Sequence, residues 1–430
     1  MDTAPLFDQP LAPSTPEAPS SDTETAPRPG FKKTKVGWIP EAWEVVRLED
    51  VCRSISSGAT PKRGNEKYFS DGEIPWIKTL DLTDSAVRTS KEKITQLAVE
   101  ENSCDVLPLD TVLVAMYGGF NQIGRTGILE IEAATNQAIC SLQIDTDRAL
   151  PRYILEWLNH RVRYWRRYAA SSRKDPNIKQ ADVRAFPTAT PPRPEQRRIA
   201  GVLSTWDRAL QQIDDLIAAK ERRKKALMQQ LLTGQTRLPK YKDQKRSRYI
   251  FKDAFRRLSS RGYQIKKSEY QETGKYPVVD QGQNRIVGYT DQENKVLKKH
   301  PLIVFGDHTR TVKWVDFPFV VGADGTQLLK TKEPCDLRYG LYLLQNTRLP
   351  NMGYSRHFKW LKEKHFYLPP LAEQHAIANI LSTCDAELEL LRTEREALQK
   401  QKKGMMQKLL TGAVRVPADH PVESTPNPTA

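Results

Sequence analysis

The sequence predicts an α+β fold in which two globular mixed α/β modules are separated by two long helices that form an antiparallel coiled coil. Three observations predict this pseudo-two-fold arrangement. One charged helical segment occurs twice along the 430 residues, each copy carries a single apolar stripe, and the stretch before each copy alternates short apolar runs with turn residues. Short runs bounded by turns are typical of strands, and a single stripe is typical of a helix that packs on one partner.

The duplicated segment is the most informative feature of the chain. A proline-led stretch at 191–200 returns at 369–378, and Leu-Leu-Thr-Gly at 231–234 returns at 409–412. The offset between the copies is the same at both ends, so the two copies align without a gap. A chain that contains the same unit twice is expected to have internal two-fold symmetry.

Each copy is predicted to form one long helix. From residue 194 to 233, apolar side chains recur at intervals of seven, as at Ile199, Trp206 and Ile213. This stripe is typical of a helix that packs against another helix. An isolated helix of this kind is not stable in water, so the two copies are expected to pack on each other, antiparallel if a two-fold axis relates the modules. Gly234 is expected to end the first helix.

The two modules are predicted to be mixed α/β domains with a common fold. In the first module, apolar runs at 74–77, 111–117, 127–129 and 138–142 predict strands, and residues 153–168 have helical spacing. The second module repeats these features weakly but in the same order. The order indicates that the modules share a fold while their surfaces have diverged.

These patterns divide the chain into six segments. Both ends are rich in proline and poor in aliphatic residues, a composition that cannot bury a core and is expected to be disordered. In chain order, the segments are an acidic N-terminal tail (1–36), the first module (37–193), the first helical repeat (194–239), the second module (240–371), the second helical repeat (372–416) and a C-terminal tail (417–430).

The charge of the chain favours a polyanionic partner. The sequence has 67 Lys and Arg against 52 Asp and Glu, a net charge of +15, and both tails are acidic, so the body is more basic still. Nucleic acid is the expected partner, and a solubility role for the charge is the alternative. The five scattered cysteines and the absence of a long apolar run favour a cytoplasmic protein with reduced thiols and no membrane contact.

The sequence contains no recognisable catalytic motif. It has no Asn/Asp-Pro-Pro-aromatic motif of an adenine methyltransferase and no phosphate-binding loop, and its seven histidines lack the spacing of metal ligands. We therefore expect a non-enzymatic binding protein without a metal or cofactor of its own. A stand-alone DNA-modifying enzyme with an unrecognised site and a helical protein-interaction scaffold are the alternatives.

Candidate DNA contacts lie in polar loops of both modules. Arg, Lys, Asn and Gln can pair with base edges, other polar side chains can grip phosphate, and glycines allow close approach of the backbone. A plain hairpin or a solvated connection is the alternative for each loop. The candidates are Lys78, Asn121, Gln122, Arg125, Ser172, Arg173, Lys174 and Lys179 in the first module, and Gln281, Asn284, His308, Arg310, Ser355, Arg356 and Lys359 in the second.

Two basic runs, 222–225 and 400–403, occupy matching places in the two helices. They either form a solvated face that offsets the helix dipole, or contact phosphate or an acidic partner. The sequence leaves these alternatives open.

The layout resembles the specificity subunit of type I restriction–modification enzymes. The resemblance covers about residues 37–416. It is carried by the proline-rich leads into Glu-Gln, by the charged helices that end in Leu-Leu-Thr-Gly, by the opening 37–40 with Trp43, and by Gly-x-Ile-Pro-Trp-Ile at 72–77. The acidic N-terminal tail and the shorter second module depart from the family pattern.

The resemblance implies two target-recognition domains that each read one half of a split, asymmetric DNA site in a bacterial or archaeal cytoplasm. It also implies docking of two adenine-N6 methyltransferase subunits that carry S-adenosylmethionine, with two motor/nuclease subunits as optional further partners. The residues expected to form the spacer or to dock these subunits are Glu195, Gln196, Ile199, Leu203, Trp206, Ile213 and Leu231 in the first repeat, and Glu373, Gln374, Ile377, Leu381, Leu391, Leu398 and Leu409 in the second.

Overall fold

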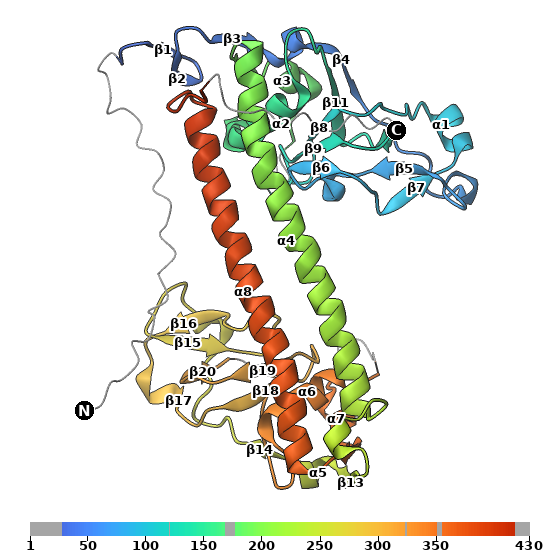
Figure 1. The fold of residues 1–430 in the computed structure, drawn as a ribbon, viewed down its shortest axis with the longest axis vertical. Helices are drawn as coiled ribbons and strands as arrows, with labels where there is room; N and C mark the ends of the chain where they lie inside the picture. The colour runs from blue at the N-terminus through green and yellow to red at the C-terminus, as the bar shows by residue number, and fades with distance from the viewer. Residues whose placement is uncertain (1–27, 120, 168–176, 323–324, 351–354, 418–430) are drawn as a thin grey trace. The chain divides into compact units, whose positions relative to one another are not determined.

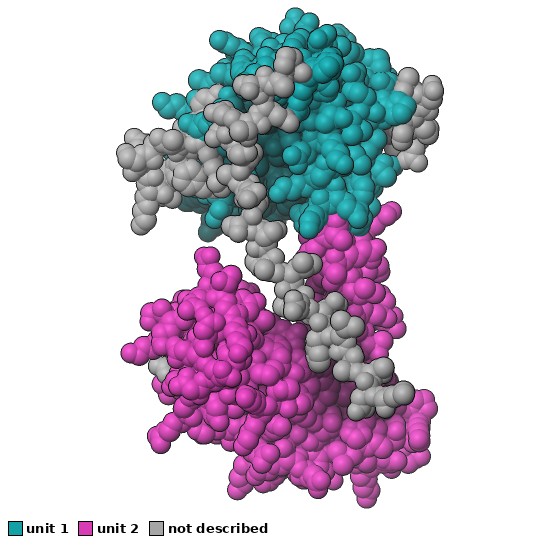
Figure 2. Space-filling view, turned by 90° about the vertical axis from the view of Figure 1, so that its left-hand side faces the viewer, with its two compact units in different colours: residues 1–209, 398–430 teal, residues 210–397 magenta. Residues whose placement is uncertain are grey.

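The fold is known from a computed structural model, which describes residues 28–119, 121–167, 177–322, 325–350 and 355–417 (Figure 1). The chain divides into two compact units (Figure 2). Unit 1 comprises residues 1–209 and 398–430, and unit 2 comprises residues 210–397. Each unit therefore combines one module with a segment of each long helix.

The two long helices form where the sequence predicts them. Helix α4 spans Arg193–Thr233 and helix α8 spans Leu371–Leu409. Each begins directly after a pair of prolines, whose second carbonyl accepts the first helical N–H groups. Each ends at a glycine in the left-handed region, with φ of 80° at Gly234 and 70° at Gly412. Glycine adopts this backbone without strain, and it stops the helix.

In both units, the segments of α4 and α8 run antiparallel. In each unit, residues further along the first repeat form ion pairs with residues earlier in the second repeat. This reverse order confirms the predicted antiparallel direction. The ion pairs that show this are Glu195–Arg415 and Asp207–Lys402 in unit 1, and Asp214–Arg395, Lys224–Asp385 and Arg237–Glu373 in unit 2.

The module of unit 1 contains two mixed sheets. The larger has the order β4 (Cys52–Ser57), β11 (Ile139–Ile144), β8 (Val112–Ala115), β9 (Thr126–Leu129) and β6 (Ser85–Val87). The smaller has the order β10 (Ala134–Thr135), β5 (Ile74–Ile77) and β7 (Glu92–Ile94). The four predicted strands are thus confirmed as β5, β8, β9 and β11. Helix α2 (Pro151–His160) packs on β8 and β9.

Shorter elements complete this module. Strand β3 (Glu44–Arg47) pairs with β12 (Pro187–Thr190), which leads into α4. Helix α1 spans Gln96–Asn102 and helix α3 spans Gln180–Arg184. The side chains of Trp43, Trp76 and Trp157 are almost fully buried, so these rings belong to the core.

The helix predicted over 153–168 is shorter than expected. Helix α2 ends at His160, and Val162–Arg167 form a 3-10 helix instead. The break occurs at Arg161, whose backbone leaves helical geometry while its guanidinium donates a hydrogen bond to the carbonyl of Val36 and lies 5.1 Å from the Trp157 ring. This tertiary contact overrides the helical spacing of the sequence.

The predicted boundary of the N-terminal tail at residue 36 is also wrong. Strand β1 (Phe31–Thr34) pairs antiparallel with β2 (Gly37–Pro40), and Val36 is buried in the core of unit 1. The hairpin forms because Lys32 and the amide of Glu41 supply hydrogen bonds that close it. Residues 1–27 and 418–430 lie outside the described residues.

The module of unit 2 repeats this topology. One sheet has the order β14 (Phe255–Leu258), β21 (Thr326–Thr331), β18 (Leu302–Gly306) and β19 (Val312–Val315). The other has the order β16 (Gly288–Thr290), β15 (Tyr276–Val279), β20 (Phe319–Val321) and β17 (Val296–Leu297). The sequence β4-β11-β8-β9 thus recurs as β14-β21-β18-β19, and β10-β5-β7 recurs as β20-β15-β16.

Helix α6 (Leu337–Asn346) packs on the sheet that contains β18, β19 and β21, as α2 packs on the equivalent sheet of unit 1. Strand β13 (Ser247–Ile250) joins helix α5 (Phe251–Ala254) and pairs with β22 (His365–Leu368), which follows helix α7 (Phe358–Lys362). Most strand pairs are antiparallel, but β5–β10, β6–β9 and β15–β20 are parallel. The fold class is therefore α+β, as predicted, and two modules of one fold account for the weak internal echo.

Candidate nucleic-acid interface

Three segments of each module hold the candidate DNA contacts. The first follows β5 or β15, the second follows β8 or β18, and the third leads into the short helix α3 or α7. The described parts of these segments are 78–81, 117–119 with 121–125, and 177–179 in unit 1, and 280–285, 307–311 and 355–359 in unit 2.

Hydrogen bonds bring the three segments of unit 1 together. The hydroxyl of Thr79 donates to the side-chain oxygen of Gln122 at 3.0 Å. The amide of Ile178 donates to the carbonyl of Met116, also at 3.0 Å. Loops that are far apart in the sequence are therefore held next to one another beside the strand ends.

The segments of unit 2 are joined in the same way and at matching places. The amide of His308 donates to the side-chain oxygen of Gln281 at 3.1 Å, and the amide of His357 donates to the carbonyl of Asp307 at 2.8 Å. Asp307 also accepts the amide of Phe358 at 2.7 Å. Asp307 and His357 thus occupy the places of Met116 and Ile178 in unit 1, and in both units this pair is buried.

The candidate side chains in unit 1 differ in their exposure and in the hydrogen bonds that they already make. Asn121 and Lys179 are exposed, and Arg125 is half-buried with its Nε donating to the carbonyl of Asn121 at 3.1 Å. Gln122 already accepts a hydrogen bond within the module. Lys78 is half-buried and paired with Glu92, and this hydrogen bond lowers the pKa of the Glu92 carboxyl.

Part of the third segment of unit 1 is not covered. Ser172, Arg173 and Lys174 lie outside the described residues. Their assignment as DNA contacts stays a prediction from the sequence.

In unit 2, Asn284, Arg310, Arg356 and Lys359 are exposed. His308 and Ser355 are half-buried, and so is Gln281, whose side chain is engaged within the module. The backbone of Arg310 has a φ of 62°, an unusual value for a residue with a side chain. Because strained backbone concentrates at functional loops, this value favours a role for the turn at 307–311.

Lys313 is a residue of this surface that the sequence analysis missed. It lies on β19, and its side chain is on the buried side of the strand together with that of Val315. Its ammonium group donates to the carbonyls of Asp280 at 2.8 Å and Asn284 at 2.5 Å, so it holds the first segment of unit 2 closed. Burial lowers the pKa of Lys313. The spacing of two residues between Lys313 and Val315 is the one signal in the sequence that could have placed Lys313 on the buried side of the strand.

The Glu-Gln pair of each repeat is buried and used inside its own unit. Gln196 accepts the amide of Leu150 at 2.9 Å and donates to the carbonyl of Pro191, and Gln374 does the same with Asp336 and Pro369. Both glutamines therefore tie the start of a long helix to the segment that precedes α2 or α6.

The glutamates of these pairs close equivalent contacts. Glu195 accepts the indole N–H of Trp43 at 3.0 Å and pairs with Arg415, whereas Glu373 pairs with Arg237. Arg237 and Arg415 are equivalent positions, because each follows the Leu-Leu-Thr-Gly of its own repeat at the same spacing. Because Glu195 and Glu373 are almost fully buried, these side chains serve the fold and are not free to dock another subunit.

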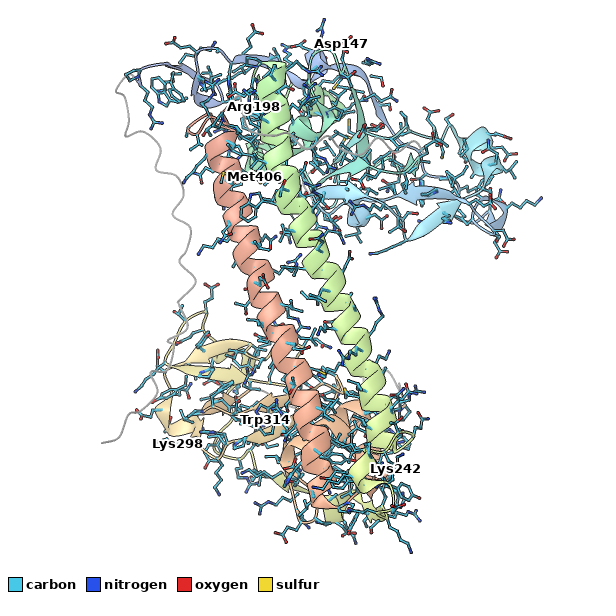
Figure 3. The ribbon with its side chains drawn as sticks, viewed as in Figure 1. Asp147, Arg198, Lys242, Lys298, Trp314 and Met406 are labelled. Atoms are coloured by element: carbon cyan, nitrogen blue, oxygen red, sulfur yellow. The ribbon has the colours of Figure 1, made fainter. Side chains whose placement is uncertain are left out.

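The apolar positions assigned to the spacer differ in burial, and the fully buried ones belong to the hydrophobic core of their own unit. Arg198 near the start of α4 and Met406 near the end of α8, both labelled in Figure 3, belong to unit 1. Trp206, Ile213, Leu391 and Leu398 are half-buried. The fully buried positions are Ile199, Leu203, Leu231, Ile377, Leu381 and Leu409.

Each basic run turns one lysine inward. Lys224 pairs with Asp385 in unit 2, and Lys402 pairs with Asp207 and Glu156 in unit 1. The remaining cations of the runs, Arg222, Arg223, Lys225, Lys400 and Lys403, are exposed. The runs are therefore neither wholly solvated faces nor wholly free for a partner.

The described residues lack both metal-binding and membrane-spanning features. In these ranges no group of three or more His, Cys, Asp or Glu side chains could hold a metal ion. No helix in the same part of the chain is long and apolar enough to cross a membrane.

Comparison with known proteins identifies the family. The sequence model of the type I restriction modification DNA specificity domain matches residues 40–219 and 253–400. Because the two matches cover most of the chain, it belongs to this family, as the sequence resemblance indicates.

Particular relatives agree with this assignment. A putative type I restriction enzyme MjaX specificity subunit of Methanocaldococcus jannaschii is 25% identical over 422 residues, which cover 90% of this chain and 97% of that protein. The EcoR124I/EcoR124II specificity subunit of Escherichia coli is 24% identical over 152 residues, 35% of this chain and 37% of that protein. The crystal structure of a type I restriction–modification S subunit from M. genitalium has the same fold, with a TM-score of 0.57 at 16% identity over 85% of this chain and 96% of that one.

Proposed function

We propose that this chain is a non-catalytic specificity subunit whose two modules read the two halves of a bipartite DNA site. The observation that carries the proposal is that two modules of one fold each gather three polar segments at the ends of their strands. A two-part reader requires two such surfaces. The relatives of known name are specificity subunits, which supports a role in recognition rather than in chemistry.

The proposed site is asymmetric, because the two surfaces carry different side chains. Unit 1 presents Asn121 and Lys179, whereas unit 2 presents Asn284, Arg310 and Arg356. Amide and guanidinium groups that pair with base edges distinguish bases, while lysines mainly contact phosphate. Half-sites about one helical turn, or about 34 Å, apart suit two modules that read one face of the duplex.

We propose further that the chain works with two adenine-N6 methyltransferase subunits, which carry the S-adenosylmethionine, and that it has no cofactor of its own. Two motor/nuclease subunits are proposed as optional further partners. Apolar side chains on the outer faces of both helices support a docking role: Leu216 of α4 is 43% exposed and Leu390 of α8 is 69% exposed. Exposed apolar positions of this kind are typical of interaction surfaces.

The test is selection of binding sites from randomised DNA by the chain with its methyltransferase subunits. Wild type is expected to select two defined blocks separated by unspecified bases. Arg356→Ala is expected to relax one block and Asn121→Ala the other, each by about 1–3 kcal/mol at the affected base pair. Equal loss at both blocks in either variant would contradict modular reading.

The alternative functions predict different results in the same assay. A protein-interaction scaffold would select no sequence, even with its partners, and its DNA binding would not fall with salt. Binding through phosphate contacts falls steeply with salt concentration. A stand-alone enzyme would modify or cut DNA without partners when given S-adenosylmethionine or magnesium.

A further inference from the structure

The inward-turning lysines of the two basic runs mark a buried junction between a module and the helix pair in each unit. Lys224 on α4 and Lys402 on α8 are separated by the offset of the repeat, so they are equivalent positions. Their aspartate partners, Asp385 and Asp207, are equivalent by the same offset. Each junction also has a third member, supplied by the module, and this third member differs.

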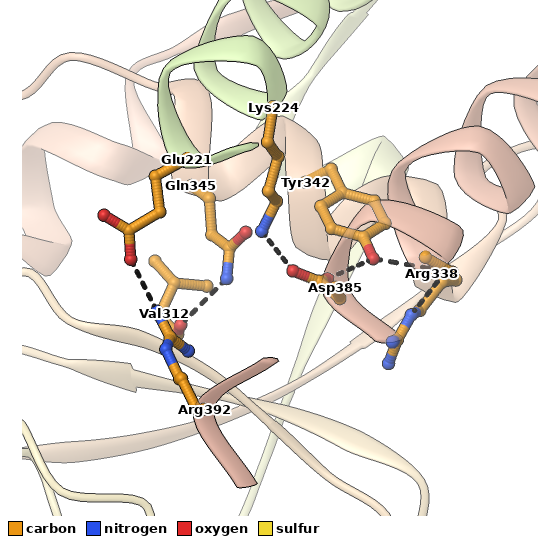
Figure 4. Close-up of polar contacts among 9 residues, drawn as sticks. Glu221, Lys224, Val312, Arg338, Tyr342, Gln345, Asp385 and Arg392 are labelled. Carbon is orange, nitrogen blue, oxygen red and sulfur yellow. Dashed lines mark hydrogen bonds and ion pairs between the residues drawn. The ribbon is translucent and has the colours of Figure 1, made fainter. Parts of the chain in front are cut away.

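In unit 2 the third member is a phenol. Tyr342 of α6 donates its O–H to Asp385 Oδ2 at 2.6 Å, while Lys224 pairs with Asp385 Oδ1 (Figure 4). The Lys224 ammonium also lies 5.5 Å from the centre of the Tyr342 ring. Lys224, Asp385 and Tyr342 thus supply one cation, one anion and one neutral donor, and the Arg338 guanidinium lies 5.7 Å from the centre of the Tyr342 ring.

In unit 1 the third member is a carboxyl group. Lys402 Nζ lies 2.6 Å from Asp207 Oδ1 and 3.2 Å from Glu156 Oε1. Glu156 is the sixth residue of α2, and Tyr342 is the sixth residue of α6, so the two occupy the same place. Glu156 is fully buried and Lys402 is 8% exposed.

The charges of this second junction balance only if one carboxyl is neutral. One ammonium group faces two carboxyl groups, of which Glu156 is fully buried and Asp207 is half-buried. An unpaired buried charge is strongly unfavourable. Glu156 Oε2 and Asp207 Oδ2 are both buried without a hydrogen-bond donor. A proton on Glu156 would supply that donor, as the phenol does in unit 2.

We propose that Glu156 is a positioning residue that is held as a neutral carboxylic acid and seats α2 on α4 and α8 in the role of the Tyr342 hydroxyl. Glu156 and Asp207 then share a proton while Lys402 balances the remaining charge. Among the described residues, the charged groups at this site are Lys402 from α8 and Asp207 from α4. Asp84, in the segment before β6, accepts the amide of Thr126. Burial raises the pKa of the Asp84 carboxyl, and the charges of Arg125 and Lys402 oppose that rise.

The protonation chemistry agrees with this geometry. Burial raises the pKa of Glu156 to about 8, Lys402 opposes the shift, and Asp207 adds to it. Burial disfavours the charge of Lys402, but the two carboxyl groups outweigh it and raise the Lys402 pKa. Burial raises the pKa of Tyr342 to about 12. As the pH rises past about 8, Glu156 therefore loses its proton while the Tyr342 hydroxyl keeps its own.

The sign of the pH effect follows from the raised pKa. The contribution of protonated Glu156 to stability is complete below the ordinary pKa of 4.5, falls as the pH rises above it, and is lost once the pH passes about 8. Alkaline conditions are therefore expected to loosen the seat of the first module and to spare that of the second. This inference does not depend on DNA binding.

The test compares wild type with Glu156→Gln, in which the amide is a permanent neutral donor. Chemical unfolding is measured at intervals from about pH 5 to pH 9, with Glu389→Gln, an exposed position on α8, as the matched control. The folding equilibrium constant of wild type, relative to that of Glu156→Gln, is expected to fall by up to about tenfold per pH unit until pH 8. After correction for the base-catalysed rise of the intrinsic exchange rate with pH, the protection of α2 amides against hydrogen exchange is expected to fall over the same range in wild type alone. Parallel profiles for wild type and Glu156→Gln would overturn the proposal.

A second measurement covers the case in which Glu156→Gln does not fold. Infrared spectra of the wild-type chain are recorded from about pH 6 to pH 9, where ordinary carboxyl groups are ionised. The proposal expects a protonated-carboxyl band at neutral pH that disappears near pH 8. The absence of any such band above pH 6 would overturn it, whatever the DNA-binding results.

Discussion

Lys313 shows how one buried side chain can hold a loop that we propose as a DNA contact. Its ammonium group bridges the carbonyls of Asp280 and Asn284, on the segment that also contains Gln281. Lys313→Met keeps the length of the side chain but leaves both carbonyls without a donor, at a cost of about 1–3 kcal/mol. We expect lower stability and relaxed reading of one half-site. Thermal unfolding and site selection check this, with exposed Lys298→Met as the control; equal behaviour of the two variants would contradict the role.

At this scale the sequence predicts less than at any other. The clusters around Gly118-Gly119 and Arg310 could be identified because glycine, amide and guanidinium groups stand together in the chain. The roles of Lys313, His357 and Glu156 could not, because each depends on partners that are distant along the chain. Gln122 and Gln281 show the converse case. Their residue type predicts a contact with a base, but their side chains already accept hydrogen bonds within their own modules.

At the scale of elements, the end of α8 depends on glycine. Gly412 has positive φ, and a Cβ there would lie 2.3 Å from Pro40 Cγ. Gly412→Ala is therefore expected to destabilise the chain by more than about 1 kcal/mol. Gly404→Ala is the matched change, because Gly404 lies inside α8 with no atom within 4 Å of an added Cβ, and it is expected to stabilise by about 0.5–1 kcal/mol. Thermal unfolding decides, and the same sign for both changes would contradict this account of the helix end.

The elements themselves could be predicted well where one pattern dominates. The heptad stripe, the leading prolines and the terminal glycines place α4 and α8 to within a few residues. The helix predicted through 168 fails at Arg161 because its side chain is drawn to the carbonyl of Val36, a contact with no local signature. The first strand of the hairpin 31–40 was missed because it has no buried residue; the buried residues, Val36, Ile39 and Pro40, follow it.

At the scale of the whole molecule, the helix pair is expected to set the distance between the half-sites. Ile213 and Leu391 are half-buried on the apolar stripes, and serine at either position would weaken the packing of the two helices. We expect the Ile213→Ser and Leu391→Ser variants to accept a wider range of spacings between the two blocks. Binding to DNA series of different spacing measures this, and Leu390→Ser, at a position 69% exposed, is the control. An unchanged spacing preference in the first two variants would count against the helix pair as the ruler.

The duplicated long helices and the shared fold of the modules lead to one central proposal, that two different surfaces on a single chain recognise two separate stretches of double-stranded DNA. The most direct measurement is site selection from randomised DNA by the wild-type complex, followed by sequencing of the bound molecules. The account predicts two different short blocks at a fixed separation with no preference between them. A single uninterrupted block, or two identical inverted blocks, would contradict it.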